Sequence, residues 1–469
     1  AGKKAFVTNR VGDWGVMMAM FLAFGATGTL SYAGINHAAE SGALSAVTAT
    51  GIATMLFIGA CGKSAQLPLY IWLPDAMEGP TPVSALIHAA TMVTAGVFVM
   101  TRINPVLAIS YDWVPTIIAV VGVATALFAA TIAVAQTDIK KVLAYSTVSQ
   151  LGFMFLAIGS GAYVAAIFHM VTHAFFKALL FLGSGSVIHG MHHEQDMRKM
   201  GALRVLMPVT ALTFIIGWLA IAGVPPFAGF WSKDEILLFA FAKSPILYVV
   251  GMITALLTAY YMTRQVIMVF FGEARWNDHS EENGAHGDFK PHESPKVMLA
   301  PLVVLAGLSI VGGAMQLPFS KNTHFLEKWL EPVIEFGEAD IHKSWAYENK
   351  YILLGIAIVV AVSGIAASYM VYSKKKFAAI EPNVMAQGWF YDKGISNFMG
   401  GPGRKAFDGI TWADRTIIDG AVNGVGKLVQ GAGGFLRKGQ TGAVRSYAAA
   451  VGLGVVALLV WFFVRGVVL

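Results

Sequence analysis

Long apolar runs recur along most of this chain, and they limit the folds open to it more than any other feature. A helix of about 18 apolar residues or more can cross the hydrocarbon core of a bilayer. Only 13% of the 469 residues are charged, against roughly a quarter in soluble domains. We therefore expect an all-α polytopic membrane protein, in which the net charge of +6 reflects loop topology rather than nucleic-acid binding.

Polar breaks divide the apolar runs into eleven candidate spans. They cover residues 12–33, 45–72, 82–103, 113–135, 142–160, 163–188, 206–240, 245–271, 297–317, 351–372 and 446–464. The second and seventh are too long for one crossing and contain Pro68 and Pro225-Pro226, so each should be interrupted near mid-membrane. The two cross in opposite directions with one lysine near each break, which is the pattern of an inverted repeat in transporters.

The segment from Lys405 to Arg437 fits no span. Its apolar residues recur with a period of about 3.6, which predicts an amphipathic helix lying along the membrane. We expect four parts: a transmembrane bundle over 1–317, a loop and one further span over 318–372, the lateral helix within 373–440, and an anchoring span within 441–469. Because the chain opens at Ala1 almost directly on a hydrophobic run, we expect the bundle to be incomplete at its N-terminus.

Lys63 lies inside the second span, beside its predicted break. An ionisable side chain at bilayer depth costs ~2.5–3.5 kcal/mol on insertion scales, and such residues mark ion pathways. Burial disfavours the charged ammonium and a nearby carboxylate favours it, so a moving partner could load or release a proton. The alternative is a lysine that snorkels to the interface, against which its position inside the span argues.

The sixth span carries His169, His173 and Lys177 at successive steps of four. On a helix they share one face, within an arc of ~80°. Histidine titrates near neutral pH, which suits the passing of protons. Two other interpretations stay open: buried structural histidines, and a zinc site, although no HExxH glutamate accompanies the pair.

Two further spans carry candidate groups. His88 forms a polar stripe with Thr91 and Thr94 on the third span, as part of a relay or as a satisfied core histidine. Lys233 follows the proline break of the seventh span, and adjacent Asp234 offers an ion pair as the alternative to transport.

Charges near span ends are harder to interpret. Asp13 with Arg10, and Asp138 before Lys140, could serve structural pairing or gating equally well. The histidines and glutamate of residues 189–194 are interpreted as a solvated loop.

Redox chemistry has no recognisable site in the sequence. A single cysteine, Cys61, excludes a disulfide framework and a multi-cysteine metal cluster. Because no dinucleotide fingerprint, P-loop or haem-attachment motif occurs, we expect no cofactor or metal in this chain.

Four stretches resemble a known family closely. Residues 62–97, 136–159, 168–204 and 229–237 are similar to the antiporter-like membrane subunits of respiratory complex I, NADH:quinone oxidoreductase. The resemblance covers essentially the whole chain, and the lateral helix followed by one last span is similar to the distal member of these subunits.

The resemblance implies proton translocation driven by quinone reduction elsewhere in the complex, within a bacterial inner membrane or an equivalent energy-transducing membrane. It implies a relay of Lys63, His88, His169, His173, Lys177 and Lys233, with Asp13, Asp138 and Asp234 as supporting charges. Flavin, iron–sulfur clusters and the quinone site would lie in other subunits. Partners would be the bilayer, the other membrane and peripheral subunits, and above all neighbouring antiporter-like subunits that the lateral helix contacts.

The family carries helices before the segment matched here, one of which holds a glutamate that pairs with the lysine matched by Lys63. We therefore expect the partner of Lys63 to precede Ala1. Two other functions stay open: an Mrp-type sodium/proton antiporter subunit, which shares the motifs, and a membrane scaffold that pumps nothing. A scaffold would not need lysines and histidines at mid-bilayer.

Overall fold

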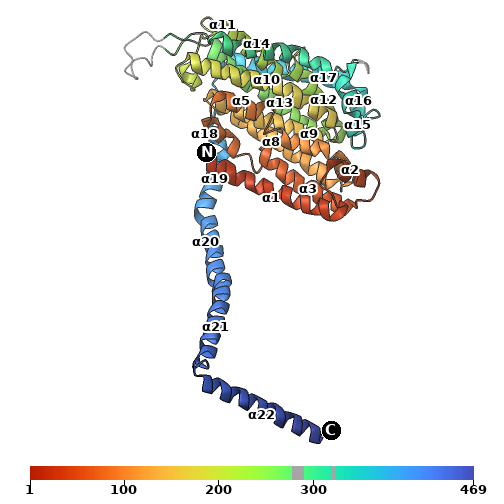
Figure 1. Cartoon of the computed structure of the whole chain (residues 1–469). Coiled ribbons are helices and arrows are strands. Elements are labelled where there is room, and N and C mark those ends of the chain that lie inside the picture. Colours follow the sequence, from red (N-terminus) through yellow and green to blue (C-terminus); the bar gives the residue numbers. More distant parts are fainter. Residues whose placement is uncertain (277–289, 320–322, 469) are drawn as a thin grey trace. The chain divides into compact units, whose positions relative to one another are not determined.

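The computed structural model describes residues 1–276, 290–319 and 323–468, and their regular structure is helical (Figure 1). The chain divides into two compact units, Ala1–Trp389 and Phe390–Leu469. The division falls inside the segment 373–440, which was expected to form a single part.

The first unit is a bundle of helices. Its first half contains α1 (Gly2–Thr27), α2 (Tyr32–Glu40), α3 (Ala46–Lys63), α4 (Trp72–Asp75), α5 (Thr81–Ala89), α6 (Ala95–Arg102), α7 (Asn104–Ile109), α8 (Trp113–Ala135) and α9 (Ile139–Gly159). Its second half contains α10 (Tyr163–Gly190), α11 (Pro208–Ala222), α12 (Ala228–Lys243), α13 (Pro245–Val266), α14 (Lys296–Val311), α15 (Phe325–Ile334), α16 (Trp345–Glu348), α17 (Lys350–Ser368) and α18 (Asn383–Ala386). In this unit α1 and α3 form one flank, α11 and α14 the opposite flank, and α8, α9 and α13 lie between them (Figure 1).

The membrane-protein interpretation is confirmed. By length and composition, eight of the described helices can cross a bilayer, and the pair α1 and α2, bent by 59°, would make a ninth. The seventh predicted span is divided between α11 and α12. Each of these two helices alone is too short to count among the eight.

Both predicted breaks are present. Helix α3 ends at Lys63, and residues 64–71 form turns before α4 begins. Helix α11 ends at Ala222, and its C-cap Gly223 has a φ of 77°, in the left-handed region that glycine adopts without strain. Helix α12 begins at Ala228, so the proline pair lies in the connection, where its missing amide donors cost no helical hydrogen bond.

A third interruption was not predicted. The span expected to be continuous over 82–103 divides into α5 and α6, with turns at residues 90–94. Two threonines stabilise the break by binding backbone carbonyls: Thr91 Oγ1 donates to Leu86 O at 2.7 Å, and Thr94 Oγ1 to Ala90 O at 2.7 Å. Such bonds compete with the backbone hydrogen bonds of a helix. The two threonines were predicted to line a polar stripe, and at this interruption they also bind the backbone.

Glycines set the closest helix contacts. A Cβ atom at Gly152 of α9 would lie 2.5 Å from Gly122 O of α8, so both positions need a bare Cα. A Cβ at Gly12 of α1 would lie 3.1 Å from Gly62 Cα of α3. The second contact places the neighbours of these glycines, Asp13 and Lys63, within reach of each other.

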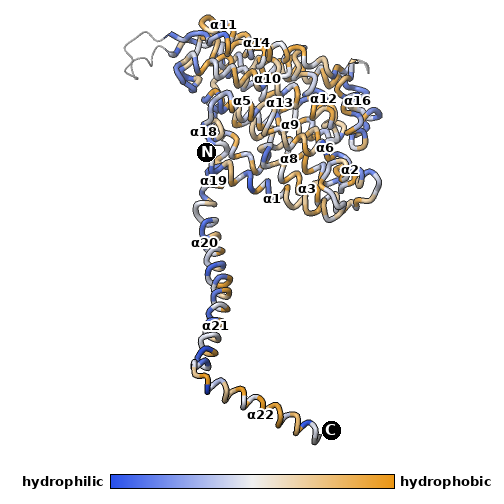
Figure 2. The backbone as a smooth tube through the Cα atoms, viewed as in Figure 1, coloured by the Kyte–Doolittle hydropathy of each residue, from blue (hydrophilic) through white to orange (hydrophobic). Residues whose placement is uncertain are grey.

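The second unit contains α19 (Tyr391–Phe398), α20 (Arg404–Ala413), α21 (Asp419–Lys438) and α22 (Val444–Val468). Short π-helical turns at Met399–Gly403 and Asp414–Ile418 join the first three into one continuous helical rod. Along α20 and α21 hydrophilic and hydrophobic residues alternate by the turn, whereas α22 is mostly hydrophobic (Figure 2). A helix is present over the predicted segment, and it begins before Lys405, at Tyr391. That it lies along the membrane stays a prediction.

Candidate functional site

Three titratable residues of α10 lie at the centre of the first unit. His169, His173 and Lys177 are all fully buried, and the rings of the two histidines lie 6.3 Å apart. The predicted common face is therefore present, and it points into the protein. Buried polar groups need partners, so the contacts of each residue define what it can do.

Lys177 is held by α9. Its ammonium donates to Leu143 O at 3.1 Å and makes a short contact with the Ser146 hydroxyl. Both partners are neutral. No carboxylate among the described residues forms an ion pair with Lys177. A buried ammonium with only neutral acceptors can give up its proton more readily than one paired with a carboxylate.

His173 connects α10 to the interruption between α5 and α6. Its Nδ1 lies 2.9 Å from Ala89 O, a carbonyl left free where α5 ends. A carbonyl can only accept, so Nδ1 carries the hydrogen, and in the neutral ring Nε2 is a bare acceptor. This Nε2 is buried without a hydrogen-bond partner among the described residues, so it can receive a proton.

His169 extends the row of polar groups towards α12. Its Nε2 lies 3.2 Å from Gln150 Oε1 and its Nδ1 lies 2.9 Å from Ser232 Oγ. Ser232 Oγ lies 2.8 Å from Thr172 Oγ1, and Ser232 directly precedes Lys233 in the chain. Hydroxyl groups both donate and accept, so they can pass a proton between the ring and its neighbours.

Lys233 is placed at the second break. Its ammonium donates to Ile221 O at 2.8 Å, near the C-terminal end of α11, and lies 5.4 Å from the centroid of the Phe153 ring. The end of a helix carries partial negative charge, so the break itself supplies a neutral counterpart for this cation.

Asp234, the residue after Lys233, borders a cavity of about 680 Å³. The cavity lies between α12, α15, α17 and the loop after α15. Its other acidic, basic and histidine lining residues are Glu235, His324, Glu327, Lys328, Glu331, Glu335, Glu338, Asp340, His342 and Lys350. Asp234 thus places a carboxyl group at this polar space one residue after Lys233, which does not line it. The described residues show no Lys233–Asp234 ion pair.

His88 is buried near the end of α5. Its ring stacks on Phe181 of α10, with centroids 5.1 Å apart, one helical turn beyond Lys177. Neither ring nitrogen has a hydrogen-bond partner among the described residues, and the same is true of Ser84 Oγ, one turn earlier on α5. Unpaired buried groups of this kind are typical places for internal water.

Lys63 has its carboxylate partner within the chain. Its ammonium lies 3.3 Å from Asp13 Oδ1, and Arg10 lies 3.5 Å from the same carboxylate. The sequence analysis did not expect this pair, which forms because α1 extends through Asp13 as a helix and the contact between Gly12 and Gly62 brings the two helices together. A further partner before Ala1 stays a prediction.

Asp138 caps a helix. Its Oδ1 accepts from the amides of Lys140 and Lys141 at 2.8 and 3.0 Å, which fixes the first turn of α9. Lys140 is buried, and its ammonium donates to Met77 O at 2.5 Å and Gly79 O at 3.0 Å, in the segment that follows the first break.

Sequence reasoning missed the partners of the relay. Ser146 and Gln150 on α9 and Ser232 on α12 contact the α10 residues, and their signal was only a polar side chain at a helical step inside an apolar span. It also missed Arg264, a fully buried arginine of α13. Its signal was plain, since a charged residue interrupts the apolar span 245–271.

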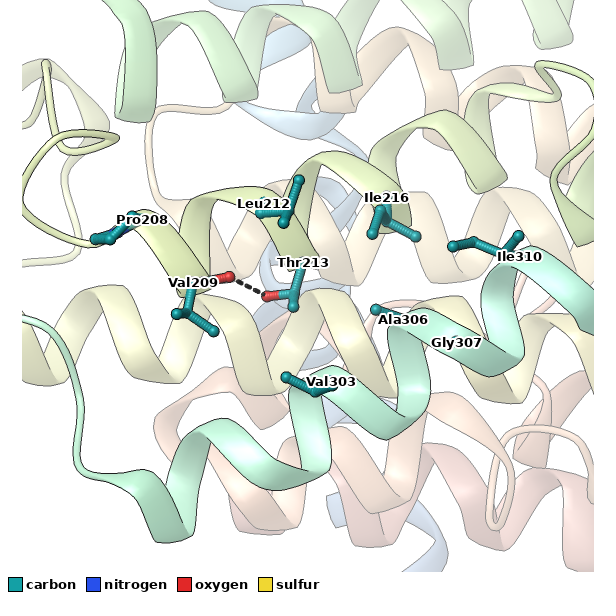
Figure 3. A pocket seen from close by; sticks show the side chains of 9 residues that line it. All are labelled: Pro208, Val209, Leu212, Thr213, Ile216, Val303, Ala306, Gly307 and Ile310. Atoms are coloured by element: carbon teal, nitrogen blue, oxygen red, sulfur yellow. Dashed lines mark hydrogen bonds between the residues drawn. The ribbon is translucent and has the colours of Figure 1, made fainter.

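Other features lie outside this site. An open groove of about 420 Å³ between α11 and α14 is lined by Pro208, Val209, Leu212, Thr213, Ile216, Val303, Ala306, Gly307 and Ile310 (Figure 3). None of these residues is titratable, and Thr213 donates its hydroxyl to Val209 O. The described residues contain no group of three or more histidine, cysteine or acidic side chains that could hold a metal.

Comparisons with known proteins identify the family of this chain. The family model of the transmembrane region of NADH:quinone oxidoreductase and Mrp antiporters matches residues 1–258, and a model of the C-terminal transmembrane helices of a complex I NADH dehydrogenase chain matches residues 260–391. The chain is 42% identical to NAD(P)H-quinone oxidoreductase chain 5 of a Picosynechococcus species, over 99% of the chain and 74% of that protein.

Two more relatives define the relationship. NADH-quinone oxidoreductase subunit L of Mycobacterium tuberculosis is 44% identical over 97% of the chain and 71% of that protein. The solved Mrp complex of a Dietzia species superposes with a TM-score of 0.61 and 25% identity, over 98% of this chain but only 46% of the Dietzia chain. The chain thus belongs to the antiporter-like membrane subunits of NADH:quinone oxidoreductase, respiratory complex I.

Proposed function

We propose that this chain carries protons across the membrane as a subunit of complex I, by means of the buried row Lys177, His173, His169 and Lys233. One observation carries the proposal: four titratable side chains lie fully or almost fully buried at the centre of a membrane bundle, and their partners are carbonyls, hydroxyls and an amide rather than fixed counter-ions. Groups held in this way can change charge without breaking a buried ion pair.

We assign the row a direction from the positions of its two ends. His88 and Lys177 lie towards the first break and the interruption after α5. Lys233 lies at the second break and directly precedes Asp234, which borders the acidic cavity. A proton would be taken up near His88, pass along α10 to His169 and Ser232, and leave from Lys233 through Asp234. Lys63 with Asp13 would control the charge at the first break, and Asp138 would support the turn that carries Lys140.

The energy for transport would come from outside the chain. Relatives named as subunits of NADH- or NAD(P)H-quinone oxidoreductase support membership of that complex. We propose that this chain performs no redox chemistry itself and holds no cofactor, so that flavin, iron–sulfur clusters and quinone lie in other subunits. The bacterial inner membrane, or an equivalent energy-transducing membrane, is the matching location.

The lateral helix would contact neighbouring antiporter-like subunits. Along α20 and α21 its apolar side chains are exposed, including Phe407, Leu428 and Phe435. Glycines at several of its positions weaken it as a rod, so it would brace neighbours rather than transmit force. Deleting 405–437 should release subunits from the complex, and a fully assembled deletion variant that fails only in pumping would contradict a bracing role.

The function is tested by Lys177→Ala and Lys233→Ala in the assembled complex. Each removes a titratable group from the row, so protons pumped per NADH should fall well below the wild-type value. Lys343→Ala, in an exposed loop, is the matched control and should leave the ratio unchanged. A normal number of protons pumped per NADH in both lysine variants, with normal assembly, would contradict the relay.

An Mrp-type sodium/proton antiporter is the second candidate, because the solved neighbour is an Mrp complex. The complex I relatives are considerably more similar in sequence, at 42% and 44% identity against 25%. Proton transport that continues unchanged in sodium-free buffer would separate the two.

A further inference from the structure

Arg264 is a buried charge that the proposed relay does not use. It lies in the last turn of α13, and its side chain has no exposed surface. Removing one partner from a buried charged pair leaves an uncompensated charge and is strongly destabilising. The partners of this guanidinium therefore show which parts of the chain it holds together.

Arg264 joins four segments through three hydrogen bonds. Its Nε donates to Glu381 Oε1 at 2.8 Å and to Tyr372 Oη at 3.2 Å, and its Nη1 donates to Gln136 O at 2.6 Å. The Tyr372 hydroxyl donates to the same Glu381 oxygen at 2.6 Å. Thus α13, the end of the α17 span, the loop before α18 and the turn between α8 and α9 meet at one side chain.

On one side the network reaches the chain that leads to the lateral helix. Gln136 Nε2 donates to Ala386 O at 2.9 Å, at the end of α18 and five residues before α19 begins at Tyr391. Trp389 Nε1 donates to Thr131 Oγ1 at 3.0 Å. The segment 381–389 is therefore attached at three points to the helices that flank the relay.

On the other side the network reaches the first break. Two residues beyond Gln136, Asp138 caps α9, and the ammonium of Lys140 holds the carbonyls of Met77 and Gly79. One turn later the same helix presents Leu143 O and Ser146 to Lys177. The orientation of the turn at residue 136 thus affects both the first break and the environment of Lys177.

We propose that Arg264 and Glu381 are positioning residues: they fasten the chain leading to the lateral helix onto the turn before α9, and so keep Asp138 and Lys140 in place against the first break. The inference rests on the proposed function, since it assigns the support of that relay. Arg264 touches none of the relay residues, so it acts only through this turn.

A nearby ion pair provides the control. Lys375 and Glu273 lie 3.0 Å apart in the same region, but their side chains are 71% and 81% exposed. An exposed pair of this kind contributes little. Lys375→Ala therefore removes an ion pair from the same segment without touching the Arg264 network.

The test compares Arg264→Gln, Glu381→Gln and Tyr372→Phe with Lys375→Ala in the assembled complex, and uses two measurements. Hydrogen exchange of residues 136–142 and 76–80 reports the turn and the first break directly. Protons pumped per NADH report transport. For Arg264→Gln the exchange protection should fall roughly tenfold or more, since a hydrogen bond to a charged group is lost, and pumping should fall with it. Tyr372→Phe should give a smaller change in the same direction, and Lys375→Ala no change.

The positioning role, its link to transport and the proposed function can each be contradicted separately. Unchanged protection at 136–142 in Arg264→Gln would overturn the positioning role, whatever happens to pumping. Reduced protection with a normal proton yield would overturn its link to transport. If Arg264→Gln does not assemble, Tyr372→Phe, which keeps the volume and loses one hydroxyl, gives the answer. A normal proton yield in Lys177→Ala would instead refute the proposed function and leave the exchange result standing.

Discussion

At the residue scale, Lys63 shows how a lysine at a helix end keeps a partner. It is the last residue of α3, where the helix dipole favours a cation, and Asp13 lies 3.3 Å away across the glycine contact of α1 and α3. Their side chains are 38% and 30% exposed, so solvent screening weakens the attraction between them.

We predict that Asp13→Asn slows proton pumping about two- to fivefold without loss of assembly, because it removes the counter-charge and keeps the shape. Pumping by the purified complex in vesicles measures this. Arg10→Gln is the matched control, since Arg10 is 59% exposed and lies 3.5 Å from the same carboxylate. Equal rates for Asp13→Asn and wild type would show that the pair plays no part in transport.

Glu338, in the loop after α15, has an altered acidity. Burial beside the acidic cavity raises its pKa from 4.5 to about 8, and the nearby carboxylates of Glu235 and Glu327 act in the same direction. The carboxyl also accepts from the amides of Tyr163 and Val164, which opposes the shift but does not outweigh it.

A raised pKa in the folded state means that folding favours the protonated carboxyl. The resulting stability is complete below pH 4.5 and is lost as the pH rises through about 8. We predict that Glu338→Gln, which keeps the acceptor for α10, flattens the dependence of thermal stability on pH between these values. Glu335→Gln, an exposed change three residues earlier, should keep the wild-type slope. A slope that persists in Glu338→Gln would assign it to another group.

At the scale of elements, α9 holds much of the site together. It offers Leu143 O and Ser146 to Lys177 and Gln150 to His169, and Lys140 extends from it to the first break. Its position depends on close contact with α8, where Gly152 meets Gly122. A shift of this one helix would therefore disturb the relay at several points.

We predict that Gly152→Ala destabilises the protein by roughly 1–3 kcal/mol, because the new methyl group would lie 2.5 Å from a backbone oxygen of α8 and force the helices apart. Thermal unfolding in detergent measures the effect. Gly424→Ala in α21 is the opposite case, since nothing lies within 4 Å of its added Cβ. There the lower backbone entropy of alanine should stabilise the helix by about 0.5–1 kcal/mol. Similar losses in both variants would contradict the packing argument.

At the scale of the whole first unit, α10 relates the two sides of the membrane. Its C-terminal end adjoins Gln195, whose carbonyl accepts from the Ile139 amide, and its N-terminal end adjoins the loop after α15, where the Ala339 amide donates to Gly161 O. A helix of 28 residues spans ~42 Å. The two loops therefore lie at opposite ends of a membrane-crossing helix.

We predict that cysteines at Gln195 and Glu335 react with an impermeant thiol reagent from opposite faces, with Gln195 on the cytoplasmic side. Lysine and arginine residues near Gln195, such as Arg198, Lys199 and Arg204, favour that orientation. The native Cys61 is buried and gives little background. Labelling of both positions from one face would contradict the topology.

The sequence by itself determined the class of fold, the two breaks that contain prolines and the candidate titratable groups. A bilayer forces apolar helices on such a composition, prolines cannot continue them, and a lysine or histidine within an apolar run is too costly to be accidental. These signals are local, so Lys63, His88, the α10 stripe and Lys233 could be named from residue type and spacing alone.

Only the tertiary structure decided the partners. That Lys63 meets Asp13, that Lys177 meets a carbonyl and a hydroxyl of α9, and that Arg264 joins Gln136 to Glu381 depends on helices distant in sequence. The interruption after α5 likewise depends on His173, which binds the freed Ala89 carbonyl from another helix. Periodicity reports which face of a helix is polar but not which helix that face meets, because helix packing is set by glycine contacts and side-chain shape across the bundle.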